Sequence, residues 1–163
     1  MELFQEFFKL AASLNKHGAK YSLVGGVALA FHGIARMTKD IDILGVPTEL
    51  ETLILALEEC GYQKLTDPWK FKDTNLTLHR YGKASSIENE LILVDLLIGE
   101  EPRHQAIISN SITDESYIGT IQVARQEDLI WMKSFRMSKQ DEADIENLHK
   151  AKDPDRESRN ASE

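Results

Sequence analysis

The sequence predicts an α/β or α+β fold, in which helices pack against a sheet and two further helices form a C-terminal extension. Three observations lead to this prediction. Apolar residues recur at helical spacing near the N-terminus and again after residue 125. Short β-prone segments, several of them separated by turns, occupy the middle of the chain. The order helix, strand, short helix, strand, helix, several strands and two helices is typical of a sheet covered by helices.

The N-terminal part predicts a helix, a strand, a short helix and a second strand. Residues 2–17 are amphipathic at helical spacing, and Gly18 is a natural stop for a helix. Residues 21–24 are short, apolar and β-prone, and residues 27–32 predict a short helix after two glycines. Residues 40–44 alternate acidic and aliphatic side chains, which indicates a strand with two unlike faces.

The middle of the chain predicts one helix and several strands. Thr48, followed by Glu51 three positions later, predicts a capping box that opens a helix running to about Cys60. Short apolar segments predict strands at residues 62–65, 69–72, 75–80, 91–98 and 117–123, with a polar loop at 81–89. The pattern of residues 100–110 is ambiguous.

Two helices are predicted to end the fold. Residues 126–137 carry apolar side chains on one face, and Ser138 with Asp141 predicts a second capping box before a helix to about Lys150. The last 13 residues, AKDPDRESRNASE, are polar and are expected to be disordered.

Composition and charge limit the classes of function. The chain has 163 residues, 42% of them hydrophobic and 28% charged, which is ordinary for one globular domain. The net charge of −8 argues against a protein that binds long nucleic acid non-specifically, and double-stranded DNA is not expected as a partner. No apolar run reaches the length of about 18 residues that spans a bilayer, and the N-terminus lacks the basic residues of a signal peptide. We therefore expect a cytoplasmic protein with no membrane partner.

Asp40 and Asp42 are the first candidate functional residues. Because they are two positions apart in a strand, they point to the same face with Cα atoms roughly 6.5–7 Å apart, while Ile41 and Ile43 point into the core. Two carboxylates so placed can bind one hard cation, and Mg²⁺ commonly takes one or two carboxylates together with substrate phosphates. The alternative is an ordinary solvated strand face, on which acidic residues are common.

Asp95 stands in the run LILVDLLI, which is otherwise aliphatic. A buried, unpaired carboxylate costs several kcal/mol, so Asp95 must pair with a cation, bind a metal or sit at the exposed end of its strand. One interpretation is a salt bridge to a lysine or an arginine. The other is a third acid beside Asp40 and Asp42, serving as a metal ligand or as the base that takes a proton from an attacking hydroxyl.

Candidate phosphate-binding residues lie between the first strand and the acid pair. Gly25 and Gly26 follow a strand and open a helix, which allows backbone N–H groups to approach an anion; a plain glycine turn is the alternative. Arg36, Thr38 and Lys39 come next, and they either bind a polyphosphate or belong to a solvated loop.

The stretch LVGGVALAFHGIARMTKDIDIL, taken as a whole, resembles the first motif of the nucleotidyltransferase superfamily with the DNA polymerase β-like fold. In that motif a strand, a Gly-Gly or Gly-Ser pair, a short helix and a strand bearing Asp-x-Asp follow one another. The later VDLL resembles the segment that carries the family's third carboxylate on a neighbouring strand. The ending QEDLIWMKSFRMSKQDEADIENL is similar to the helical tail of small bacterial members, the stand-alone and AbiEii-like toxin-type nucleotidyltransferases of type IV toxin–antitoxin systems.

The resemblance covers residues 20–150 and implies a domain organisation. The expected fold is the polymerase β-like nucleotidyltransferase fold, an α/β (α+β) arrangement with a mixed sheet flanked by helices and a small C-terminal helical extension. Residues 1–124 would form the catalytic domain, residues 125–150 the helical extension and residues 151–163 a disordered tail.

The resemblance also implies a reaction. A nucleoside triphosphate, ATP included, would bind with two Mg²⁺ ions, or with Mn²⁺ in their place, and its triphosphate would lie near Gly25 and Gly26. Asp40, Asp42 and Asp95 would hold the metals, and Asp95 would help to deprotonate an acceptor hydroxyl. The acceptor oxygen would attack the α-phosphorus, and pyrophosphate would leave.

Lys133 and Arg136 complete the candidate residues. They lie three positions apart on the first C-terminal helix and share one of its faces, so they either reach a phosphate or the acceptor, or are exposed helix charges.

Three functions remain open on this sequence. The leading one is a Mg²⁺-dependent nucleotidyltransferase whose acceptor is the 3′ end of tRNA, a protein hydroxyl or a small molecule. Such an enzyme could be the toxin of a type IV system, with an antitoxin or regulatory protein as its partner. The second is a catalytically silent module of the same fold that acts with a partner protein, and the third is a metal-binding hydrolase that uses water as the acceptor.

Overall fold

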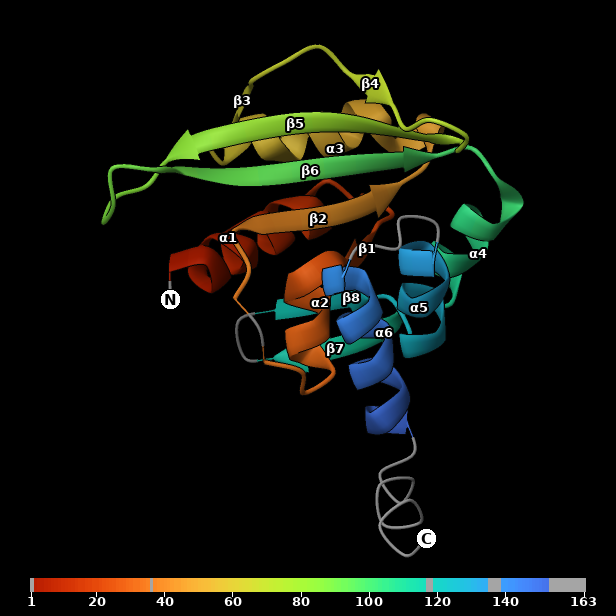
Figure 1. Cartoon of the computed structure of the whole chain (residues 1–163). Coiled ribbons are helices and arrows are strands. Elements are labelled where there is room, and N and C mark those ends of the chain that lie inside the picture. Colours follow the sequence, from red (N-terminus) through yellow and green to blue (C-terminus); the bar gives the residue numbers. More distant parts are fainter. Residues whose placement is uncertain (1, 36, 117–118, 135–138, 153–163) are drawn as a thin grey trace, which may run out of the picture.

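Residues 2–35, 37–116, 119–134 and 139–152 are described in a computed structural model of the chain (Figure 1). Within these ranges one sheet is formed in the order β3-β5-β6-β2-β1-β8-β7, and β4 pairs separately with β5. The strands are β1 (Ser22–Val24), β2 (Asp40–Gly45), β3 (Gln63–Lys64), β4 (Trp69–Lys70), β5 (Leu76–Ala84), β6 (Leu91–Gly99), β7 (Ile112–Ser116) and β8 (Gly119–Val123). Because β2 and β6 are parallel, as are β1 and β8, while the other pairs are antiparallel, the expected mixed sheet is confirmed.

The helices flank this sheet. They are α1 (Glu2–Lys16), α2 (Gly25–Phe31), α3 (Leu50–Glu59), α4 (Pro102–Ser109), α5 (Gln126–Ser134) and α6 (Lys139–Lys152), with a 3₁₀ turn at Pro47–Glu49. Helices α1 and α3 pack on each other, and α5 packs on α6. Figure 1 shows the long β5–β6 hairpin in the upper part of the view and β7 and β8 in the lower part. No helix within the described ranges is both long and apolar enough to cross a membrane.

The core lies where α1 and α3 cover the sheet. Phe7 and Leu10 of α1, Leu57 of α3, and Ile41 and Ile43 of β2 are fully buried in one apolar cluster. Burying each such side chain contributes about 1.5–3 kcal/mol. Since Ile41 and Ile43 face this core, the acidic residues between and beside them in β2 must face away from it.

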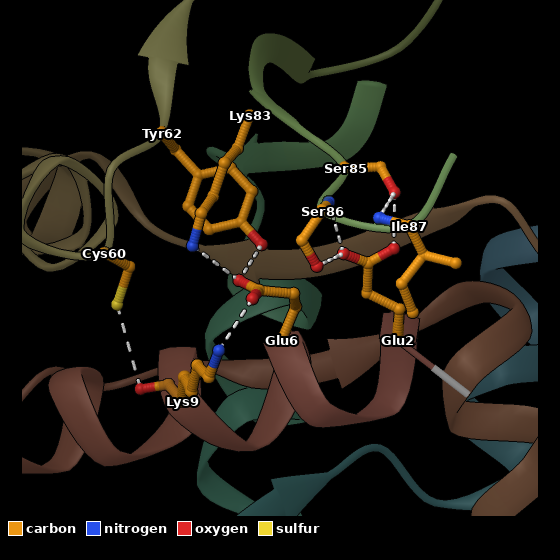
Figure 2. Close-up of polar contacts among 9 residues, drawn as sticks. All are labelled: Glu2, Glu6, Lys9, Cys60, Tyr62, Lys83, Ser85, Ser86 and Ile87. Atoms are coloured by element: carbon orange, nitrogen blue, oxygen red, sulfur yellow. Dashed lines mark hydrogen bonds and ion pairs between the residues drawn. The ribbon is translucent and has the colours of Figure 1, made fainter. Parts of the chain in front are cut away.

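A polar network fastens α1 to the β5–β6 hairpin (Figure 2). The buried carboxylate of Glu6 accepts hydrogen bonds from Lys83 of β5 and Lys9, each at 3.0 Å, and from the Tyr62 hydroxyl at 3.2 Å. Burial alone would raise the pKa of Glu6, but the bonds from the two lysines outweigh it and hold the pKa below its usual value. The network therefore satisfies a buried charge on α1, in part through Tyr62 and Lys83, which lie 56 and 77 positions away along the chain.

One turn of α1 earlier, Glu2 makes the same kind of attachment. Its carboxylate accepts hydrogen bonds from the Ser85 hydroxyl at 2.5 Å and from the backbone and hydroxyl of Ser86 at 2.8 and 2.7 Å (Figure 2). Ser85 follows the last residue of β5, so this contact fixes the end of the strand against the start of the helix.

Several sequence predictions are corrected by the structure. The capping box at Thr48 is not formed, because a 3₁₀ turn precedes α3 and the helix cap at Glu49 has no side-chain hydrogen bond. The loop predicted at residues 81–89 is wrong in its first part, because β5 continues to Ala84 in unbroken pairing with β6. The polar strand β7 was not predicted; it is an edge strand that pairs only with β8 among the described residues.

Candidate active site

The register of β2 and β6 brings acidic residues from two distant segments together. Asp42 lies directly beside Asp95 in this parallel pair, and Asp40 lies beside Leu93. Register partners in a parallel pair point to the same side of the sheet, so Asp40, Asp42 and Asp95 share one face. We call these three residues the acidic face. Asp95 is buried, whereas Asp40 and Asp42 are each partly exposed.

Arg80 of β5 binds the carboxylate of Asp95 in a bidentate contact through two nitrogens of its guanidinium. Its Nε donates to Oδ1 at 2.8 Å and its Nη2 donates to Oδ2 at 2.9 Å. The Asp95 side chain is 5% exposed and that of Arg80 is 34% exposed. On its other side the Arg80 guanidinium lies 5.6 Å from the centre of the Trp69 ring, within the range of a cation–π contact. The salt bridge that the sequence left open for Asp95 is therefore present.

The charges of the acidic face act on one another. Burial, and then the negative charge of Asp95, raise the pKa of Asp40, while Arg80 and Lys39 oppose that rise. The hydrogen bonds to Asp95 raise the pKa of Arg80, and the charges of Asp40 and Asp42 add to the effect. The three carboxylates and Arg80 therefore form one electrostatic unit.

Gly25 packs directly against Asp42, and its position requires glycine. Its φ is +71°, which disfavours any residue with a Cβ. A Cβ at this position would lie 2.8 Å from Cγ of Asp42 and closer still to Oδ2. Gly26 is buried in the first turn of α2 and has no such conformational need.

The remaining predicted phosphate-binding residues have different positions. The Thr38 hydroxyl donates to the Asp40 carbonyl oxygen at 3.2 Å, which fixes the start of β2. Lys39 is exposed next to Asp40, and its charge reaches that carboxyl. Arg36 and Arg136 lie outside the residues that the structure describes.

Lys133 is not the exposed helix charge that the sequence allowed. Its Nζ donates to Oδ2 of Asp144 in α6 at 2.9 Å, and the side chains are 10% and 1% exposed. This ion pair ties α5 to α6. Sequence reasoning missed Asp144, because it lies 11 positions from Lys133 and no local pattern fixes how the two helices pack.

The donor set of the acidic face fits a divalent cation only in part. Asp40 and Asp42 supply the hard carboxylate oxygens that Mg²⁺ prefers. Among the described residues, however, no three His, Cys, Asp or Glu side chains are arranged to hold a metal ion. At Asp95 both carboxylate oxygens already accept hydrogen bonds from the Arg80 guanidinium. Asp40 and Asp42 therefore offer donors of the right chemistry, whereas both oxygens of Asp95 are bound to Arg80.

Comparison with known proteins gives one family. The family model described as "Nucleotidyl transferase AbiEii toxin, Type IV TA system" matches residues 9–154. Comparison with curated proteins gives no significant match.

Solved structures share the fold at low sequence identity. An antigenic nucleotidyltransferase-like protein from Paracoccidioides brasiliensis has a TM-score of 0.61 at 17% identity, over 92% of this chain and 75% of its own. A suspected nucleotidyltransferase from Thermotoga maritima has a TM-score of 0.61 at 14% identity, over 91% of each chain. ANT(2″)-Ia, solved in complex with adenylyl-2″-tobramycin, has a TM-score of 0.54 at 14% identity, over 93% of this chain and 88% of its own. At these low sequence identities the similarities show the fold alone.

Proposed function

The chain belongs to the nucleotidyl transferase family of AbiEii toxins of type IV toxin–antitoxin systems, and on this premise we propose that it transfers a nucleoside monophosphate to an acceptor hydroxyl with the help of a divalent cation. Membership confirms the resemblance seen in the sequence and makes the chain a nucleotidyltransferase. The observation that carries the finer proposal is the acidic face, where β2 and β6 place Asp42 beside Asp95.

In this proposal Asp40 and Asp42 hold the cation, which is Mg²⁺ or Mn²⁺, and Asp95 joins them once Arg80 has released its carboxylate. Once bound, the cation would stabilise the negative charge that develops on the attacking and leaving oxygens. Asp95 takes the proton of the acceptor hydroxyl, which requires Arg80 to release at least one of its carboxylate oxygens. The acceptor oxygen then bonds to the α-phosphorus, the bond from that phosphorus to the bridging oxygen breaks, and pyrophosphate leaves.

The phosphate side of the proposed site starts at Gly25 and Gly26. Gly25 lies against the Asp42 carboxylate, so a triphosphate beside this glycine would be next to a proposed cation ligand. Lys39 brings a positive charge to the same edge, next to Asp40. We propose further phosphate contacts from Arg36, Thr38, Lys133 and Arg136 as well.

The acceptor and the partner are proposed more coarsely. ANT(2″)-Ia was solved with an adenylylated aminoglycoside, so a small-molecule acceptor is one class to test here, beside the 3′ end of RNA and a protein hydroxyl. The family description also names a type IV toxin–antitoxin system. We therefore propose that the chain is the toxin of such a system and that an antitoxin protein is its partner.

One observation favours the alternative of a silent binding module. Arg80 already neutralises Asp95, and the described residues hold no three-ligand metal group. A module of this kind would keep the fold and the ion pair but would bind no nucleotide in a metal-dependent way.

Thermal unfolding with each of the four nucleoside triphosphates, with and without Mg²⁺, separates the two functions. A ligand at a hundredfold excess over its Kd stabilises a protein by about 2.7 kcal/mol. We expect a Mg²⁺-dependent rise in Tm for the wild type, lost in Asp40→Asn/Asp42→Asn and kept in Asp67→Asn. Asp67 is a suitable control because its side chain is 96% exposed in the β3–β4 connection.

The nucleotide that stabilises the protein is then tested as a donor. Incubation of the labelled triphosphate with RNA, protein and aminoglycoside acceptors should label one class and release pyrophosphate. If no nucleotide raises the Tm and no acceptor is labelled, the silent module is the better description.

A further inference from the structure

We infer that Arg80 is a positioning residue of the acidic face, which binds both carboxylate oxygens of Asp95 and must be displaced before a divalent cation can use that carboxylate. The inference rests on the proposed function and deepens it. It names the residue that controls access to the third acid of the acidic face.

The geometry makes Arg80 and a cation competitors. A guanidinium that donates from Nε and Nη2 to the two oxygens of one carboxylate makes a strong, charge-assisted pair. A divalent cation that uses Asp95 needs lone pairs of the same two oxygens. It would also lie within a few ångströms of a fixed positive charge, which opposes its binding.

The strand order places Arg80 where this competition matters. Arg80 lies beside Asp95 in the antiparallel β5–β6 pair, and Asp95 lies beside Asp42 in the parallel β6–β2 pair. Three neighbouring strands therefore carry the sequence arginine, aspartate, aspartate across one face. The positive charge of Arg80 also acts on Asp40 and Asp42, so it opposes a cation at either of these two acids.

Arg80 also has a second contact to retain when it leaves Asp95. Its guanidinium is partly exposed and lies over the ring of Trp69, which β4 places beside β5. A cation–π contact of this kind keeps a guanidinium at the protein surface without a carboxylate partner. A shift of the guanidinium toward Trp69 and solvent would therefore keep one favourable contact.

Calorimetric titration with Mn²⁺ alone tests the competition directly. We expect Arg80→Gln to lower the Kd for Mn²⁺ about tenfold, because a nearby positive charge has been removed. Lys64→Gln serves as the matched control, since it also removes one positive charge from a neighbouring strand, at a side chain 54% exposed. It should change the Kd less than twofold. In an Asp95→Asn background, Arg80→Gln should give a clearly smaller gain, because the ligand that it frees is missing.

A second measurement leaves Arg80 in place. Trp131→Phe makes Trp69 the one tryptophan of the chain, so its emission reports on the contact with Arg80. Titration with Mg²⁺ should change this emission in the Trp131→Phe protein and should leave it unchanged when Asp95→Asn is added. This titration decides the question if Arg80→Gln fails to fold.

The outcomes separate the inference from the proposed function. An unchanged Kd in Arg80→Gln, an equal gain with and without Asp95, or a silent Trp69 signal overturns the role of Arg80. Absence of any metal binding by wild type and variant overturns it as well. Nucleotidyl transfer by the wild type is assayed separately. If Arg80→Gln binds Mn²⁺ more tightly but the wild type transfers to no acceptor, the inference is supported and the proposed reaction is contradicted.

Discussion

Two carboxylates of this protein are almost equally buried, yet their surroundings differ. The side chains of Glu6 and Asp95 are 6% and 5% exposed. Glu6 accepts hydrogen bonds from Lys9, Lys83 and Tyr62, and two positive charges therefore face one negative charge. All three donors therefore bond to the same carboxylate, and the network joins α1 to β5 (Figure 2).

Asp95 is neutralised by one arginine, and that arginine is shared. Asp40 and Asp42 lie on the same face, so three carboxylates meet Arg80 and the nearby Lys39. Negative charge is in excess there, whereas two lysines contact the single carboxylate of Glu6. The comparison shows that a buried acid is not by itself a mark of a metal site. An excess of carboxylates over their cations on one face is the more telling feature.

Asp42→Asn should have the largest effect on activity. It removes a proposed cation ligand. Mutating a residue that only hydrogen-bonds to a metal ligand typically lowers metal affinity or activity 10- to 100-fold, so we expect transfer to fall by at least about a hundredfold. Stability should change much less than activity, because Asp42 is partly exposed. Labelled-nucleotide transfer and urea unfolding measure the two effects, and normal turnover in this variant would remove Asp42 from the site.

Glu6→Gln is the matching change in the other region and should show the opposite pattern. It leaves Lys9 and Lys83 without their carboxylate, and because both lysines are partly exposed we expect a loss of about 1–3 kcal/mol in unfolding free energy. Mn²⁺ affinity should not change. A variant that is fully stable, or that binds the metal differently, would show that the two regions are not independent.

Gly25→Ala tests the close approach behind the acidic face. A Cβ there meets the Asp42 side chain, and the positive φ adds strain of about 1–3 kcal/mol. We expect lower stability together with weaker metal binding, since the carboxylate must move. The control is Gly33→Ala, where φ is +79° but a Cβ meets nothing within 4 Å; equal metal affinities in the two variants would contradict the role of Gly25.

The smallest expected effect is in the pH dependence of stability. The pKa of Glu6 is lowered in the folded protein, so its contribution is present above the unfolded pKa and is lost as pH falls through the folded one. The pKa of Asp40 is raised, so its contribution is present below the unfolded pKa and is lost as pH rises through the folded one. Urea unfolding in acid should therefore show a weaker pH dependence in Glu6→Gln and a stronger loss on acidification in Asp40→Asn. Parallel curves for both variants and the wild type would contradict these shifts.

The sequence predicted the parts of the site that depend on local pattern. Alternation in DIDIL placed Asp40 and Asp42 on one face, and the aliphatic run around Asp95 indicated a carboxylate that needs a partner. The partner itself depends on the β5–β6 register, which no local pattern fixes, so Arg80 was missed. The ion pair of Lys133 with Asp144 depends in the same way on how two helices pack.

The fold was predictable to a similar degree and for similar reasons. Strands with apolar runs, such as β2 and β6, were predicted close to their observed bounds. The edge strand β7 was not, because ITDES carries no apolar alternation and its pairing with β8 decides its conformation. Thr48 illustrates the converse, since its capping pattern is overridden by the turn that Pro47 begins.

The arrangement of β6 between β5 and β2 has a consequence for the order of folding. Arg80 and Asp95 lie 15 positions apart in a hairpin, whereas Asp42 and Asp95 lie 53 positions apart. Closing the shorter loop costs less chain entropy, so we expect the hairpin to form first. Asp95 would then enter the nascent sheet already neutralised, and its repulsion toward Asp42 would be weakest when β2 docks. Pulse-labelled hydrogen exchange would show β5 and β6 amides protected before those of β2, and simultaneous protection would rule this order out.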